Sequence, residues 1–296
     1  MIKKILCFLM LFSTAFCLLL SPVTQAQEVK VLSSSDPIVI GYTSSKSFFA
    51  DANVQAYLKK YSNAKLIFRG YTSRCDLLTA LQTGKIDLFY GTLSEMYAIQ
   101  ANKLDYQPLL KTLSGSRDSN QVSDTYNFAL LSYDPKIESL YSLKNQTVAF
   151  ADTLSMSGSI LPRYVLSALG VGFQPLALVS SDAAMQALKS DKAKAAATWW
   201  PSSAMQPKQG RILFELREIP NPVVFVKSSF LQDRTDRYAL IAALMSFPSS
   251  VYESNYPLSF TLFANEDEYQ AWISRLQSMG VLKNPLSQQS GLCTAN

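Results

Sequence analysis

The chain has no histidine among its 296 residues. Ser-His-Asp and Cys-His catalysis and most zinc sites need an imidazole, so these functions are excluded. The charges are scattered, with neither a basic run nor an alternation of arginine and aromatic residues, which argues against nucleic-acid binding. We therefore predict no catalytic residue, no metal site and no cofactor.

Long apolar runs are also missing, apart from one near the N-terminus. Two lysines precede the run Ile5–Leu20, and small residues lead to a plausible cleavage point after Ala26. This arrangement predicts a secretory signal peptide over residues 1–26, because the run is short for a membrane-spanning helix. Cys17 lies within the run, but the bulky Phe16 before it does not suit lipoprotein processing. We expect export followed by release.

Cysteine is scarce, and only Cys75 and Cys293 would remain after cleavage. In an oxidising compartment they could form one disulfide, worth about 4 kcal/mol in the chain-entropy model, or they could be two buried thiols. The remaining 270 residues suffice for one large or two medium domains. They carry 25 basic and 22 acidic residues, a net charge of +3 that is compatible with a small anionic ligand.

Short apolar runs alternate with amphipathic stretches along the chain, a pattern typical of α/β proteins with largely parallel sheets. The expected strands are residues 38–42, 66–68, 87–91, 126–131, 148–151, 176–179, 195–198 and 223–226. The expected helices are residues 51–61, 75–82, 93–100, 161–169, 182–190, 236–245 and 267–279. The polar stretch from Ser114 to Thr125 is expected to be a loop that crosses from one α/β unit to a second.

The segment from Asp152 to Pro162 gives the clearest functional signal. It joins an expected strand to an expected helix, whose first N–H groups have no partners within the helix and carry partial positive charge. With the hydroxyl groups of Ser155, Ser157 and Ser159, this loop is suited to an oxyanion such as phosphate. The alternative is that these serines only cap the helix.

Other candidates follow from the rule that ligands of open α/β sheets bind beyond the carboxyl ends of the strands. Such positions include Tyr71, Tyr90, Thr92, Ser94 and Trp199. A buried tyrosine hydroxyl needs a hydrogen-bond partner, which a ligand could supply, and a tryptophan could stack on it. The same side chains could instead belong to the core.

Two of these segments together resemble a known family. The sequence Asp87-Leu-Phe-Tyr-Gly-Thr-Leu-Ser-Glu-Met-Tyr-Ala98 and the loop from Asp152 to Pro162 are similar to motifs of periplasmic phosphonate-binding proteins, the receptors of ABC importers for phosphate, phosphite and phosphonate. The resemblance implies a type II periplasmic-binding-protein fold with two lobes, each a mixed, mostly parallel sheet flanked by helices. The lobes would comprise residues 37–125 plus 228–296, and residues 126–227.

The resemblance also implies a set of ligand contacts. In the family, the serine-rich loop grips the phosphonate oxygens and a tyrosine corresponding to Tyr126 faces the ligand. Thr92 and Ser94 lie on the opposing helix start, and Tyr71 is near another family tyrosine. The full candidate set is Ser155, Met156, Ser157, Gly158, Ser159, Tyr126, Tyr90, Thr92, Ser94, Tyr71, Trp199 and Asn221.

Two departures from the family pattern concern the ligand. Met156 stands where the family has a threonine, which removes one hydroxyl donor. The acidic residues that hold the amine of an aminoalkylphosphonate are replaced, one of them by Asn221. A cationic tail then has no evident partner, so we predict that 2-aminoethylphosphonate is not the preferred ligand.

These observations predict an exported, monomeric, periplasmic solute-binding protein and not an enzyme. It would capture a small oxyanion resembling phosphonate, phosphite or phosphate, and would deliver it to an ABC permease in the inner membrane. One alternative is a ligand-sensing module for a membrane signalling partner. A serine hydrolase using Ser155 or Ser157 is disfavoured because the Gly-x-Ser-x-Gly elbow is missing.

Overall fold

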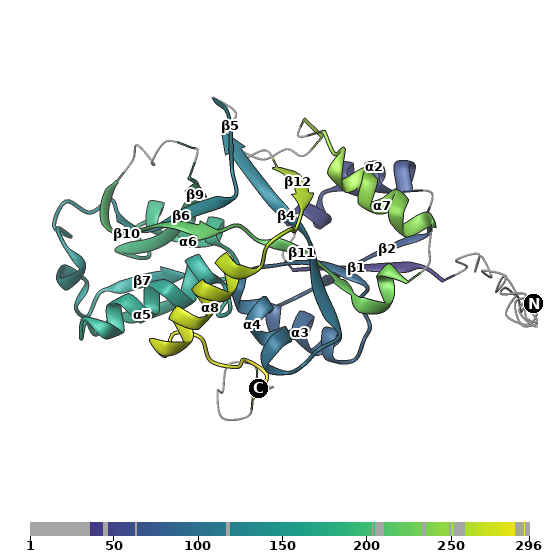
Figure 1. Ribbon diagram of the computed structural model, residues 1–296. Coiled ribbons are helices and arrows are strands. Elements are labelled where there is room, and N and C mark those ends of the chain that lie inside the picture. The colour runs from purple at the N-terminus through teal and green to yellow at the C-terminus, as the bar shows by residue number, and fades with distance from the viewer. Residues whose placement is uncertain are drawn as a thin grey trace, which may run out of the picture. The chain divides into compact units, whose positions relative to one another are not determined.

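Two sheets, each flanked by helices, form the part of the chain that the structure describes (Figure 1). The expected mixed α/β fold is thus confirmed. The expected signal segment 1–26 lies outside that part, and no described helix is long and apolar enough to cross a membrane. The computed structural model describes residues 36–43, 47–62, 64–116, 119–202, 204, 210–232, 235–248, 250–251, 258–287 and 293.

The first sheet has seven strands in the order β12-β4-β11-β3-β1-β2, with β5 paired to β4. β1 is parallel to β2 and β3, and the other pairings are antiparallel. Its strands are β1 (Ile38–Thr43), β2 (Leu66–Tyr71), β3 (Leu88–Gly91), β4 (Tyr106–Ser116), β5 (Ser119–Ser123), β11 (Val223–Lys227) and β12 (Leu258–Leu262).

Alternating side chains let this sheet bury both of its faces. Phe89 packs with α3, α4 and α8, whereas its neighbour Leu88 packs with α2 and α7 on the opposite face. The helices are α2 (Ala52–Ser62), α3 (Arg74–Gln82), α4 (Leu93–Ala101), α7 (Thr235–Met245) and α8 (Asp267–Ser278), with short turns η1 (Phe48–Ala50) and η4 (Ser228–Leu231).

The second sheet has the order β10-β6-β9-β7-β8. β7 is parallel to β8 and β9, while β6 is antiparallel to β9 and β10. Its elements are β6 (Thr125–Ser132), η2 (Leu140–Leu143), β7 (Thr147–Phe150), the π-helical turn η3 (Met156–Ile160), α5 (Leu161–Ala168), β8 (Gln174–Ala177), α6 (Ser181–Lys189), β9 (Ala195–Pro201) and β10 (Arg211–Pro220).

The structure corrects three expectations. The polar stretch Ser114–Thr125 is not a plain loop, because it contains the end of β4 and all of β5. The sheets are not mostly parallel, since antiparallel pairings outnumber parallel ones in the described strands. The strand β11, which lies in the segment expected for the second lobe, pairs with β3 and β4 of the first sheet.

Candidate functional site

The serine loop, defined as residues Asp152–Ile160, joins β7 to α5 as the sequence predicts. Ser155 is the cap of the helical turn: its backbone is extended, and its Oγ accepts a hydrogen bond from the N–H of Gly158 at 3.2 Å. A Cβ on Gly158 would lie 2.5 Å from the Cβ of Ala151, so only glycine fits this close approach. The capping interpretation is therefore correct for Ser155.

Capping uses only part of the donors that the serine loop offers. The N–H groups of Ser159 and Ile160 both donate to the carbonyl of Ser155 at 2.9 Å. The N–H groups of Met156 and Ser157 have no acceptor in the described part of the chain. An orphan pair of donors at a helix start is an arrangement that binds oxyanions.

Ser157 and Tyr126 bring hydroxyl groups to the same place. The Ser157 side chain lies close enough to the hydroxyl of Tyr126 to influence its pKa, and both residues are buried. Burial is the main cause that raises the pKa of Tyr126 above its ordinary value, so this hydroxyl keeps its proton at neutral pH. Trp199 presents its ring edge-on to Tyr126, with centroids 6.2 Å apart.

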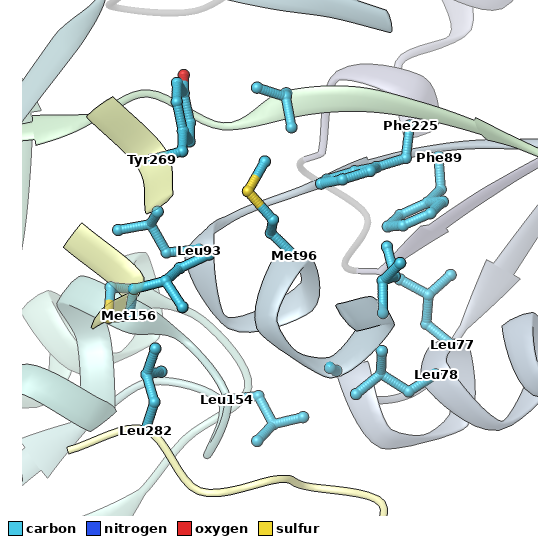
Figure 2. Close-up of a cluster of buried hydrophobic side chains, with 14 of the residues drawn as sticks. Leu77, Leu78, Phe89, Leu93, Met96, Leu154, Met156, Phe225, Tyr269 and Leu282 are labelled. Atoms are coloured by element: carbon cyan, nitrogen blue, oxygen red, sulfur yellow. The ribbon is translucent and has the colours of Figure 1, made fainter. Parts of the chain in front are cut away.

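Ser159 does not join this group. It is fully buried, and its Oγ accepts a hydrogen bond from Nε of Arg163 at 3.0 Å. Met156 is also directed elsewhere: its side chain is 1% exposed and belongs to an apolar cluster that includes Leu93 and Leu282. Figure 2 shows Met156 and Leu154 among these side chains of the first sheet's helices and the C-terminal segment. The serine loop is thus anchored to the first sheet by apolar contacts.

The start of α4 faces the serine loop through Ser94. The Oγ of Ser94 donates to the carbonyl oxygen of Leu154 at 2.8 Å, and it lies 2.8 Å from Oγ1 of Thr92. Glu95 completes a capping box, since its Oε2 accepts from the N–H of Thr92 at 2.7 Å and from the Thr92 hydroxyl at 2.6 Å. Thr92 and Ser94 are therefore brought beside the serine loop, as the resemblance implies.

A charged group that the sequence did not single out lies at the same junction. Arg74 forms an ion pair with the fully buried Glu95, and its Nε lies 4.0 Å from Oδ1 of Asp152 in the serine loop. The N–H of Arg74 also donates to Oδ2 of Asp152 at 3.3 Å. Burial disfavours both charges, but their mutual attraction and hydrogen bonds outweigh it, so the pKa of Glu95 is lowered and that of Arg74 is raised. Both groups are charged at neutral pH.

Tyr90, Tyr71 and Asn221 are the remaining candidate residues, and their surroundings differ. The side chain of Tyr90 is close enough to Tyr126 and Tyr269 to interact electrostatically with both. The hydroxyl of Tyr71 is buried and has no hydrogen-bond partner among the described residues. Asn221 is buried between the sheets, and its Nδ2 donates to backbone or side-chain oxygens of Thr112, Ser114 and Ser123 at 3.0, 3.1 and 2.8 Å. The structure thus places the side-chain amide of Asn221 in the crossing connections, where protein oxygens already accept its hydrogen bonds.

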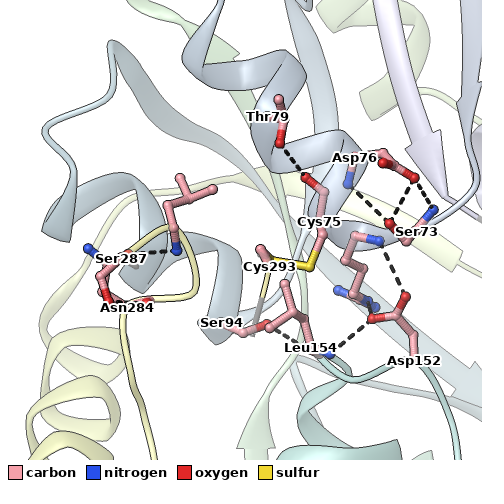
Figure 3. Close-up of a disulfide and its surroundings, with 12 residues drawn as sticks. Ser73, Cys75, Asp76, Thr79, Ser94, Asp152, Leu154, Asn284, Ser287 and Cys293 are labelled. Carbon is pink, nitrogen blue, oxygen red and sulfur yellow. Dashed lines mark hydrogen bonds and ion pairs between the residues drawn. A yellow bond between two sulfur atoms is a disulfide. The ribbon is translucent and has the colours of Figure 1, made fainter. Parts of the chain in front are cut away.

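The disulfide that the sequence left open is formed between Cys75 and Cys293, with their Cα atoms 5.2 Å apart. It attaches the C-terminal segment to the first turn of α3, directly after Arg74 (Figure 3). No group of three or more cysteine, aspartate or glutamate side chains in the described part could hold a metal ion.

The fold agrees with solved solute-binding proteins. PhnD1 of Prochlorococcus marinus in complex with methylphosphonate aligns with a TM-score of 0.61 at 13% identity, over 83% of this chain and 99% of that one. The binding component of a Pseudomonas aeruginosa phosphonate transporter gives 0.59 at 14%, over 86% and 93%. The alkanesulfonate-binding protein SsuA of Xanthomonas axonopodis pv. citri, bound to MOPS, gives 0.52 at 18%, over 83% and 94%. These likenesses establish a type II periplasmic-binding-protein fold.

The family is identified by a match to a protein-family model. Residues 42–276 match the model described as "ABC transporter, phosphonate, periplasmic substrate-binding protein". The chain therefore belongs to the periplasmic phosphonate-binding family of ABC transporter substrate-binding proteins. No curated protein matches the chain.

Proposed function

We propose that this protein captures a small phosphonate-, phosphite- or phosphate-like oxyanion between two lobes for an ABC importer. The observation that carries the proposal is the set of donors at the serine loop. It comprises the unpartnered N–H groups of Met156 and Ser157 and the hydroxyl groups of Ser157 and Tyr126. Neutral donors fixed at a helix start stabilise an anion without a nearby cation.

The two lobes are built around the two sheets, so that the serine loop and the start of α4 approach the ligand from opposite sides. Ligand binding favours closure, because polar groups of both lobes contact the anion together only in the closed form. No bond is made or broken in this mechanism. The proposed surroundings of the ligand also include Ser155, Tyr90, Tyr71 and Trp199. The contact of Trp199 with Tyr126 positions the tryptophan ring.

The cellular role follows from the family. We propose export through the signal segment 1–26, release after Ala26, and action as a monomer in the periplasm. The partner is the permease of an ABC transporter in the inner membrane.

The ligand is expected to carry no ammonium group. Asn221 replaces an acidic residue that would hold such a group, and its Nδ2 already lies within hydrogen-bond distance of three protein oxygens.

A thermal-shift screen of small oxyanions tests the proposal. Methylphosphonate, phosphite, phosphate and methanesulfonate are added to the wild type and to Ser157→Ala. We expect at least one anion to raise the melting temperature of the wild type, because a ligand that binds only the folded state stabilises it. The substitution removes a charge-assisted hydrogen bond worth about 1.5–3 kcal/mol and should abolish most of the shift.

The matched control is Ser180→Ala. Ser180 caps α6 of the same sheet, where its Oγ accepts from the N–H of Ala183 at 3.2 Å. This variant loses a helix cap worth about 1 kcal/mol but should keep the full ligand-induced shift. An unchanged shift in Ser157→Ala would place the anion elsewhere.

A further inference from the structure

The hydrogen atoms of the Thr92 and Ser94 hydroxyl groups are already used within the protein. Each hydroxyl has a single hydrogen to donate. The Oγ of Ser94 lies 2.8 Å from the carbonyl oxygen of Leu154 and 3.2 Å from Oε2 of Glu95. The Oγ1 of Thr92 lies 2.6 Å from the same carboxylate oxygen. The carbonyl and the ionised carboxylate only accept, and the two hydroxyl oxygens lie 2.8 Å apart, so the hydrogens of both hydroxyls are used within this group.

Glu95 enforces this orientation. Its side chain has no exposed surface and is paired with Arg74, which keeps it ionised. A buried carboxylate that lost the Thr92 hydroxyl as a donor would be destabilised, so a ligand cannot easily turn that hydroxyl around. To a ligand held by the serine loop, Thr92 and Ser94 therefore offer lone pairs and no hydrogen.

The two sides of the proposed site are consequently unlike. The serine loop offers N–H and hydroxyl donors, which suit the ionised oxygens of an anion. The start of α4 offers acceptors, which suit a hydroxyl on the ligand and repel an ionised oxygen. A ligand that matches both sides is an oxyanion that retains one acidic proton.

We infer that the site selects a singly protonated phosphorus oxyanion, whose P–OH group donates to Thr92 or Ser94, over a sulfonate that has no proton to donate. The inference rests on the proposed function, because it assumes that the anion lies between the serine loop and the start of α4. A site built to hydrogen-bond a particular group discriminates strongly against a ligand without it, since its polar groups are then left unpaired.

Isothermal titration with methylphosphonate and methanesulfonate, which are similar in shape, tests this inference. At about pH 6, we expect methylphosphonate to bind at least tenfold more tightly than methanesulfonate. Above the second ionisation of methylphosphonate, its apparent affinity should fall by up to tenfold per pH unit, because only the protonated fraction binds. Equal or tighter binding of methanesulfonate, or tighter binding of methylphosphonate at higher pH, would overturn the inference.

The charged and titratable groups around the hydroxyls of Thr92 and Ser94 do not obscure the pH dependence of methylphosphonate binding. They are Arg74 of α3, Glu95 of α4, Asp152 of the serine loop, and the tyrosines Tyr90, Tyr126 and Tyr269. The chain has no histidine, the side chain that ordinarily titrates near neutral pH. Any residual titration of the protein would also change the binding of methanesulfonate at the same pH.

Variants of Thr92 separate failure of this inference from failure of the proposed function. Thr92→Val removes the acceptor and should lower the preference for methylphosphonate at least tenfold, whereas Thr92→Ser keeps the hydroxyl and should retain it. A preference unchanged in Thr92→Val overturns only the inference. If neither anion binds the wild type and the thermal-shift screen also finds none, both the inference and the proposed function fail. Melting curves of each variant confirm that it is folded.

Discussion

Arg74 occupies the first position of α3, where the helix dipole disfavours a positive charge. Its partners explain this unusual position: Glu95 from α4 and Asp152 from the serine loop both face it. A positive charge at the start of a helix was the sequence feature that could have revealed the role of Arg74. Its partners are distant in the sequence, and no sequence pattern pairs them with it. Glu95 also forms a capping box with Thr92, which gives it a structural role at the start of α4.

The first prediction concerns the acid stability that Glu95 provides. Its pKa is lowered in the folded protein, so its contribution is present above the unfolded value of about 4.3 and is lost as the pH falls through the folded value. Urea unfolding of Glu95→Gln should show a loss of about 3–5 kcal/mol near neutral pH and a smaller pH dependence between about pH 5 and about pH 3 than the wild type.

The control for this prediction is Glu138→Gln, which changes an exposed glutamate. Its unfolding free energy should remain within about 0.5 kcal/mol of the wild type. Parallel stability curves for the wild type and Glu95→Gln would show that the buried ion pair does not stabilise the fold.

At the scale of elements, periodicity predicted the parallel strands and the helices that connect them. Runs such as Val148–Phe150 are buried on both faces, and such continuous apolar runs are readily recognised. The strands β5 and β10 escaped notice because they are polar or only half buried, so their sequence resembles a loop. Their position depends on pairing with β4 and β6, which is a tertiary interaction that local sequence does not reveal.

The crossing between β10 and β11 gives the second prediction. Asn221 stands where the resemblance places an acidic residue, yet its amide donates to the carbonyl groups of Thr112 and Ser123. Asn221→Asp would set a carboxylate against these oxygens and should lower the free energy of unfolding by about 1–3 kcal/mol or more. It should not create tight binding of 2-aminoethylphosphonate, because the side chain points into the crossing.

Chemical denaturation and titration calorimetry measure the two effects. Asn53→Asp, at an exposed position in the first turn of α2, is the control and should leave stability nearly unchanged. A stable Asn221→Asp protein that binds 2-aminoethylphosphonate tightly would show that Asn221 faces the ligand after all.

For the molecule as a whole, one apolar cluster connects the two sheets. Leu154 and Met156, which follow β7 of the second sheet, share it with Leu93 and Tyr269 of the helices that cover the first (Figure 2). The sequence predicted two α/β units, but it did not predict this shared core, because apolar side chains carry no information about their partners across the fold.

The disulfide gives the third prediction, since it joins residues that are 218 positions apart. Cross-linking lowers the entropy of the unfolded chain most when the closed loop is long. The double variant Cys75→Ser/Cys293→Ser should lose about 2–5 kcal/mol of stability under oxidising conditions. A reducing agent should lower the melting temperature of the wild type but not that of the variant; equal melting temperatures for the oxidised wild type and the variant would contradict the stabilising role.

The central claim is that an oxyanion is held by the serine loop and Tyr126. A crystal structure of the wild type with methylphosphonate tests it most directly. We predict phosphonate oxygens within hydrogen-bond distance of Oγ of Ser157, the hydroxyl of Tyr126 and the N–H groups of Met156 and Ser157. A phosphonate bound away from these groups, at a concentration that stabilises the protein, would contradict the claim.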